Sequence, residues 1–425
     1  MKATRTLLTC TLLVLCLLGL GLTVRARLAS PAVPPAPELT TVPTSTPEPT
    51  PEPTPEPTPE PTPEPEAQTV SLAVSYRGTP VAVLTDGDYN SSKNFMPGEP
   101  MLIKAEQPIS ALYIQWGYTP APWTLSCGEQ ILNLGEHGFR HEYVPLPEAR
   151  TELTITLPGG DEPWIAEIYG FTAGARPDWV QDWEEPWDQA DLLVFPTHSD
   201  DEFIFLGGVI PYYVDQGKRV QTCFVVQHNA GRYHEMLDSQ WAAGMTHYPV
   251  TSRKMDVYQN TLGGAIEYYN QDYMTSYMVE QIRRFRPQVV VGQAEDGDSG
   301  HIVHVFGVMC LKDAVERSGD EGWYAESCEK YGVWDVPKTY LHRYGAEENM
   351  VSMDFDAPLS SFGGLSAFDA ADHAFSLCVS QYQAGKYAVY RHDSPHDGSK
   401  FGLYRSTVGE DVLRSDLFEN LTAAG

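Results

Sequence analysis

Basic side chains are scarce in this chain. Of its 425 residues, 28 are lysine or arginine and 57 are aspartate or glutamate, which gives a formal net charge of −29. Proteins that bind nucleic acids use clustered lysine and arginine to displace counterions from phosphates. The charge balance therefore excludes a nucleic-acid partner and is typical of an acidic, well-solvated surface.

Cysteine is also sparse, and its seven copies show no spacing that indicates a site. Two of them, Cys10 and Cys16, lie in an apolar run near the start of the chain. The other five are scattered without any Cys-x-x-Cys pair: Cys127, Cys223, Cys310, Cys328 and Cys378. This pattern predicts neither a disulfide framework nor a cysteine zinc site, so we expect buried free thiols.

The longest apolar run stands at the beginning of the sequence. Lys2 and Arg5 precede residues 7–24, which are almost entirely apolar. This order predicts an export signal or a membrane anchor over residues 1–30. The run is long for a cleaved signal and just long enough to span a bilayer as a helix, so both alternatives stay open. Either one predicts an extracytoplasmic protein, secreted or held at the cell surface, with the membrane as a partner if the segment is uncleaved.

A low-complexity tract follows the apolar run. Residues 46–65 repeat "TPEP", in which proline fixes φ and removes backbone donors while the glutamates repel one another. We therefore predict that residues 31–68 form an extended linker that holds the rest of the chain away from a membrane or cell wall.

Short alternating segments bounded by Gly, Pro, Asp and Asn occupy residues 69–172 and predict an all-β sandwich. Their order resembles the discoidin-like, galactose-binding-like jelly roll. In that resemblance "LTDGDYNSS" is the early calcium-type loop, with Asp86 and Asp88 as candidate Ca²⁺ ligands. The alternative is that Asp-Gly-Asp is turn chemistry only.

Three aromatic residues of this region, Trp116, Tyr118 and Trp123, are candidates for stacking on sugar rings. The alternative is that they occupy half-buried positions on strands.

After a connector at residues 173–190, the pattern changes to alternating strands and helices over residues 191–425. The apolar runs "DLLVF", "VQTCFVV" and "PQVVVG" predict strands, and helical stretches lie between them. This alternation predicts an α/β doubly wound, mostly parallel sheet of the Rossmann type. Ligands of such sheets bind beyond the carboxyl ends of the strands, and "THSDDEFIFLGG" follows the first predicted strand.

That stretch resembles the His-x-Asp-Asp-Glu signature of the PIG-L/LmbE-like N-acetylglucosamine deacetylases. Further motifs follow in the family's order over about residues 191–381: "RYHEMLDSQWAAG", "IRRFRPQVVVGQ", "EDGDSGHIVHVFG" and "VWDVPKTYLH". The resemblance implies an LmbE-like fold and removal of an acetyl group from an amino sugar or cell-surface glycan. It also implies that Arg232 faces the substrate rather than pairing with Glu235. The sequence departs from the family at Ser199, where proline is usual, and at Cys378, where histidine is usual.

The residue types also point to metal chemistry. A catalytic zinc takes three nitrogen or oxygen ligands and leaves one position open, and His198, Asp201 and His304 provide such a set. Zinc is expected, although other divalent metals suit the same donors.

The neighbouring polar residues have roles in the same scheme. Asp200, next to a ligand, is the candidate general base. His301 is placed to stabilise the oxyanion or to protonate the departing amine, and Glu202 to anchor the loop. The family's substrate-side aspartate is either Asp256 or Asp272.

The sequence thus predicts an exported zinc-dependent carbohydrate N-deacetylase. One alternative is another metal-dependent amidase or esterase. A second is a surface sugar-binding adhesin whose α/β domain holds metal without catalysis.

Overall fold

The computed structural model describes residues 64–157 and 163–421. The predicted export segment, residues 1–30, and most of the predicted linker lie outside the described residues. Residues 62–425 belong to one compact unit. In the part of the chain that the structure describes, no helix is both long and apolar enough to cross a bilayer.

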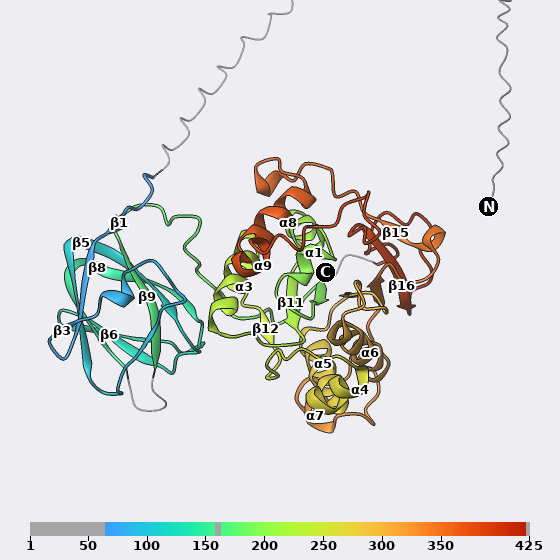
Figure 1. Cartoon of the computed structure of the whole chain (residues 1–425), viewed down its shortest axis with the longest axis horizontal. Coiled ribbons are helices and arrows are strands. Elements are labelled where there is room, and N and C mark those ends of the chain that lie inside the picture. The colour runs from blue at the N-terminus through green and yellow to red at the C-terminus, as the bar shows by residue number, and fades with distance from the viewer. Residues whose placement is uncertain (1–63, 158–162, 422–425) are drawn as a thin grey trace, which may run out of the picture. The chain divides into compact units, whose positions relative to one another are not determined.

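The first region is an antiparallel β-sandwich, as predicted (Figure 1). Its elements are β1 Thr69–Val70, β2 Leu72–Tyr76, β3 Thr79–Pro80, the short helix η1 Ala82–Leu84, β4 Lys93–Asn94, β5 Pro100–Trp116, β6 Trp123–Cys127, β7 Gln130–Leu134, β8 His141–Thr156 and β9 Trp164–Phe171. The strands of the central path run in the order β1-β9-β5-β8-β6-β7. β5 and β8 are long because their pairing continues through register shifts around Ile109, where the sequence suggests a break.

Two of the three aromatic candidates for sugar stacking are in the sandwich core. Trp116 and Trp123 are buried among the apolar side chains of the strands, and their indole N–H groups both donate to Glu142. These two residues therefore stabilise the sandwich and present no face to a sugar. Tyr118 is exposed.

The second region contains a seven-stranded sheet in the order β12-β11-β10-β13-β14-β16-β15. Its strands are β10 Leu192–Phe195, β11 Val220–Phe224, β12 Val250–Thr251, β13 Val289–Gly292, β14 Lys338–His342, β15 Val351–Ser352 and β16 Lys400–Ser406. The first five are parallel, whereas β16 pairs antiparallel with β14 and β15. The predicted mostly parallel α/β sheet is confirmed.

Helices cover both faces of this sheet (Figure 1). The α-helices are α1 Asp201–Ile204, α2 Val209–Asp215, α3 Ala230–Ala242, α4 Leu262–Ala265, α5 Gln271–Phe285, α6 Ile302–Arg317, α7 Ala325–Tyr331, α8 Ala367–Ser376 and α9 Val379–Tyr382. The other helical segments are η2 Ile266–Asn270, η3 Glu347–Asn349 and η4 Ser360–Phe362.

The two faces of the sheet have separate apolar cores. Along β10, Leu192 and Val194 face the core that includes α2, α3 and α8, and Leu193 and Phe195 face the core that includes α5 and α6. Strand side chains alternate between faces, so a strand covered on both sides is apolar at every position.

The sheet topology determines where a ligand site can form. β10 is central, and the chain leaves it first toward β11 and later returns to its other side at β13. Such a reversal opens a crevice beyond the carboxyl ends of the two adjacent strands. The segments after β10 and β13 carry His198, Asp201, His301 and His304.

Buried polar contacts link the β-sandwich to α3. The Nε2 atom of His141 lies 2.7 Å from Nδ1 of His234, and the Arg140 guanidinium lies 3.7 Å from the centre of the Tyr233 ring. Gln181, in the connector, donates to Asp238 over 2.6 Å. Because α3 also carries Arg232, these contacts support the helix that approaches the candidate site.

Candidate active site

Asp201 stabilises the loop that follows β10 by a side-chain hydrogen bond to its backbone. The Oδ2 atom of Asp201 accepts the backbone N–H of His198 over 2.7 Å, and Gln293, just after β13, accepts the N–H of Thr197 over 3.0 Å. The loop therefore bends so that the His198 and Asp201 side chains lie on one side of the crevice.

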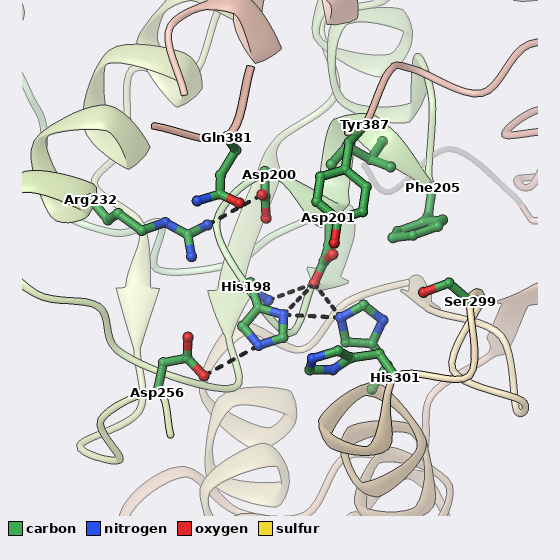
Figure 2. A pocket seen from close by; sticks show the side chains of 12 residues that line it. His198, Asp200, Asp201, Phe205, Arg232, Asp256, Ser299, His301, Gln381 and Tyr387 are labelled. Carbon is green, nitrogen blue, oxygen red and sulfur yellow. Dashed lines mark hydrogen bonds and ion pairs between the residues drawn. The ribbon is translucent and has the colours of Figure 1, made fainter. Parts of the chain in front are cut away.

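His198, Asp201 and His304 form a compact triangle of ligand atoms. Figure 2 shows His198 and Asp201 side by side in the pocket. His198 Nδ1 lies 3.0 Å from His304 Nε2, and each of these nitrogens lies 3.1 Å from Asp201 Oδ2. A tetrahedral zinc with bonds of about 2.0–2.2 Å separates its ligands by roughly 3.3 Å. The three predicted metal ligands thus come together at nearly the spacing that one ion requires.

In His198 and His304, the ring nitrogen that does not belong to the triangle contacts another group of the protein. Nδ1 of His304 lies 3.1 Å from both the carbonyl oxygen of Gly297 and Nε2 of Gln293, and Nε2 of His198 faces Asp256 Oδ1 at 3.4 Å. With those nitrogens protonated, His198 Nδ1 and His304 Nε2 both present lone pairs to the same point. This is the arrangement by which outer hydrogen bonds orient metal-binding histidines, and it fits a cation.

The electrostatics agree with a cation at this point. Burial alone would lower the pKa of His198, but the charges and hydrogen bonds of Asp201 and Asp256 outweigh burial and raise it. For Asp201, burial is opposed by His304 and His198, which hold its pKa well below its usual range. The site therefore stabilises a positive charge beside Asp201.

Asp200 is held in a strained conformation next to the triangle. Its φ of 144° is rare for a residue with a side chain, and its Oδ2 lies 3.2 Å from the Arg232 guanidinium. Burial and the adjacent Asp201 raise the pKa of Asp200, against the opposing effect of Arg232. A buried carboxylate of raised basicity beside a metal position suits proton transfer.

Glu202 supports this loop, as the sequence suggests. It is fully buried, accepts the backbone N–H of Asp200 over 3.0 Å and accepts Gln240 Nε2 over 2.7 Å. Burial raises the pKa of Glu202 to about 8. Its contacts are with the protein, and it does not line the cavity.

His301 immediately precedes α6 and lies beside the triangle. Its ring centre is 5.0 Å from that of His198 and 4.5 Å from that of His304. Nitrogen atoms of these three histidines lie within 4.8 Å of one another, so His301 also lies within reach of an ion. Burial, followed by His304 and His198, lowers the pKa of His301 to about 4. The ring is therefore a neutral hydrogen-bonding group at pH 7.

A cavity of about 140 Å³ opens over these groups. Figure 2 shows Arg232 and Gln381 on one side of it and Ser299 on the other, with Tyr387 above Asp201. Arg232 donates to the Ser199 carbonyl over 2.9 Å, and Glu235 binds Ser380 instead of Arg232. The predicted approach of Arg232 to the substrate side is thus compatible with the geometry.

The structure separates the two candidates for the substrate-side aspartate. Asp256 lines the cavity and contacts His198. Asp272 lies in the first turn of α5, accepts the Tyr324 hydroxyl and does not line the cavity. Asp256 is therefore the residue of this pair that belongs to the site.

Several supporting residues were not predicted from the sequence. His228 accepts the N–H of Ser199, and a buried hydrogen bond between His342 and Asp298 fixes the loop before His301. Gln381 and Tyr387 reach the cavity from the region that follows α8. The position of His342 at the carboxyl end of β14, near the site edge, was a signal that could have identified it.

In the sandwich, the predicted calcium loop packs against Glu167. Asp86 accepts the Asp88 N–H, Asp88 accepts the Asn90 N–H, and Oε1 of Glu167 accepts the N–H groups of Gly87 and Asp88. The Oε2 atom of Glu167 is buried, and its carboxyl group shares a hydrogen bond with that of Asp86. Burial and Asp86 raise the pKa of Glu167 to about 7. The carboxyl groups of Asp86 and Glu167 are thus close enough to share one proton or one cation. Asp88 instead accepts a hydrogen bond from the backbone of its own loop.

No protein-family model matches this chain. Among curated proteins, it is similar to 1D-myo-inositol 2-acetamido-2-deoxy-alpha-D-glucopyranoside deacetylases of Streptomyces scabiei and Streptomyces avermitilis. The first is 27% identical over 182 residues, covering 36% of this chain and 55% of the relative. The second is 25% identical over 210 residues, covering 42% of this chain and 70% of the relative. The chain therefore spans about half the length of the first relative.

Solved structures show a more distant similarity to this chain. N,N'-diacetylchitobiose deacetylase from Pyrococcus horikoshii is 14% identical, covering 47% of this chain and 74% of its own, with a TM-score of 0.34. An F5/8 type C domain from Bacteroides fragilis is 14% identical, covering 26% of this chain and 98% of its own, with a TM-score of 0.21.

Proposed function

Because the curated relatives confirm the predicted resemblance of the α/β region to the PIG-L/LmbE-like deacetylases, we propose that this chain is a metal-dependent sugar N-deacetylase. Its substrate is an N-acetylglucosamine-type sugar or glycoconjugate, and its metal is zinc. The observation that carries the proposal is the convergence of His198 Nδ1, Asp201 Oδ2 and His304 Nε2, separated by 3.0–3.1 Å, in a cavity that also contains Asp200.

His198, Asp201 and His304 are the residues that would hold the ion. When bound, zinc supplies Lewis-acid chemistry, polarising the acetyl carbonyl and acidifying water. The donor set of two imidazoles and one carboxylate is one that zinc hydrolases use, with a further position left for water or substrate.

The protein's own groups divide the proton transfers. Asp200 takes a proton from the attacking water, and Arg232 orients that carboxylate from 3.2 Å. His301, neutral at pH 7, donates a hydrogen bond to the oxyanion that develops on the acetyl carbonyl. The proton held by Asp200 then passes to the departing amine, so acetate and the free amino sugar are the products.

The substrate class rests on the relatives' names and on the site. The curated relatives are named for deacetylation of an acetamido sugar joined to inositol. The polar cavity, with Arg232, Ser299 and Gln381 in its lining, suits the hydroxyls of such a sugar.

Acetate release tests the function. Purified protein is incubated with N-acetylglucosamine, its oligomers and acetylated glycolipids, before and after a chelator and after zinc is returned. We expect acetate from at least one acetylated amino sugar, loss of release with chelator and recovery with zinc. Release from simple amides or esters only would favour a different metal-dependent hydrolase. Sugar binding without acetate release would favour an adhesin whose metal site is silent.

We further propose that the enzyme acts outside the cytoplasmic membrane, secreted or anchored through residues 1–30. The support is the apolar run followed by the Pro- and Glu-rich linker. In the sandwich we propose a Ca²⁺ site centred on Asp86 and Glu167, supported by the close approach of these two carboxyl groups and by the burial of Oε2 of Glu167.

A further inference from the structure

Tyr258 is an exposed aromatic residue beside the catalytic cavity. Its exposed fraction is 69%, and its ring meets that of His301 edge-on, with centres 5.8 Å apart and planes at 70°. Its side chain is not among those that line the cavity itself. The phenol ring therefore lies just outside the space where the acetyl group must bind.

The backbone on which Tyr258 stands is firmly anchored. Asp256 N–H donates to the Gln227 carbonyl over 2.8 Å. At Val257, both backbone groups bond the hydroxyl of Tyr269, which accepts the N–H and donates to the carbonyl, each over 2.9 Å. The Tyr269 ring is fully buried. The backbone that leads into Tyr258 is thus anchored to the core.

The segment that carries Tyr258 runs beside the metal site, because Asp256 contacts His198. Met255 and Val257, on either side of Asp256, are 43% and 40% exposed. The exposed ring of Tyr258 beside His301 is therefore available to a part of the substrate that extends out of the cavity.

We propose that Tyr258 is a specificity-determining residue that stacks on a second pyranose ring joined to the acetylated sugar. This inference rests on the proposed deacetylase function. A pyranose presents an apolar face of C–H groups, and burial of that face on an aromatic ring is favourable. Because the backbone next to Tyr258 is already held in place, less entropy is lost when the sugar binds. The preferred substrate is therefore an oligosaccharide or glycoside of at least two rings.

The test compares one ring with two. Acetate release is measured for N-acetylglucosamine and for its β-linked disaccharide with wild type, Tyr258→Ala and Tyr258→Phe. We expect kcat/KM of Tyr258→Ala to fall about two- to twelvefold on the disaccharide, chiefly through KM, as for the loss of one aromatic contact. The monosaccharide value should stay within about twofold, and Tyr258→Phe should behave as wild type. Trp323→Ala, which removes an exposed aromatic side chain that does not line the cavity, is the control.

Binding without turnover gives a second readout. In an Asp200→Asn background, calorimetric affinity for the disaccharide should weaken on addition of Tyr258→Ala, while affinity for the monosaccharide should not. Equal losses on both substrates, or no loss on the disaccharide, would overturn the role of Tyr258 while leaving the deacetylase intact. No acetate from either substrate with wild type would instead contradict the proposed function for these sugars.

Discussion

Asp200 combines features that a structural carboxylate would not need. It is buried, its φ lies at 144°, its pKa is raised by burial and by Asp201, and its charge faces Arg232. Strain of this kind persists only where surrounding contacts impose it, and Glu202 provides one through the Asp200 N–H. At the scale of single residues, the site therefore separates binding of the ion from transfer of the proton.

Asp200→Asn tests that separation. The substitution keeps the shape and removes the basicity, so we expect turnover to fall by about two to four decades with the metal retained. Acetate release and metal content are measured on the same preparation. Near-normal turnover would assign the proton transfer to another residue.

Asp256→Asn tests support of the ligands from outside the triangle. Loss of the charge facing His198 Nε2 should weaken metal affinity about 10- to 100-fold, as is typical when a residue that orients a metal-binding histidine is replaced. Titration with a competing chelator measures this affinity. Asp272→Asn is the matched control, since Asp272 lies away from the cavity, and an equal effect in both variants would contradict the assignment.

At the scale of elements, the apolar runs predicted the central strands well, because a strand buried on both faces is apolar throughout. β10, β11 and β13 lie where these runs predict strands. The antiparallel β16 was not predicted, because five of its seven residues are only partly buried and its position depends on pairing with β14. Around Cys378 the chain forms two helices, α8 and α9, rather than one.

The candidate site, like the fold, was predicted only in part from the sequence. The His-x-Asp-Asp-Glu signature and the histidine pair identified the triangle, since their spacing within one loop and one helix is local. Gln381 and Tyr387 were missed because long-range packing brings them to the cavity, and no short-range pattern marks them.

The loop that contains Asp86 and Asp88 gives a prediction for pH. Burial raises the pKa of Glu167 in the folded protein from 4.5 to about 7. The unfolded chain therefore releases this proton at lower pH, and the metal-free fold loses stability as pH rises from about 4.5 to 7. Calcium would replace the proton, so calcium should raise Tm more at about pH 8 than at about pH 5. Calorimetry of wild type and Glu167→Gln measures this, and a calcium effect unchanged in the variant would exclude Glu167 as a ligand.

At the scale of the whole molecule, the sandwich contributes none of the proposed catalytic ligands, yet it contacts α3 through buried polar groups such as His141. A chain that begins at Asp178 should therefore have a lower Tm, since it loses the partners of Tyr233 and His234. Each folded, metal-loaded molecule should still release acetate from a small soluble sugar. An inactive but folded and metal-bound truncated protein would show that the sandwich shapes the site.

The linker gives a prediction about location. Protease added to intact cells should cut within residues 46–65 and release a fragment that contains the sandwich and the α/β region together. A fragment protected until the cells are lysed would contradict an extracytoplasmic location.

The central claim is that His198, Asp201 and His304 together hold one catalytic divalent ion. The most direct measurement is elemental analysis of purified wild type and His304→Ala, paired with acetate release from the same samples. We expect close to one zinc per wild-type chain, and loss of both zinc and acetate release in the variant. Wild type without a transition metal, or a variant that keeps its full metal content, would contradict it.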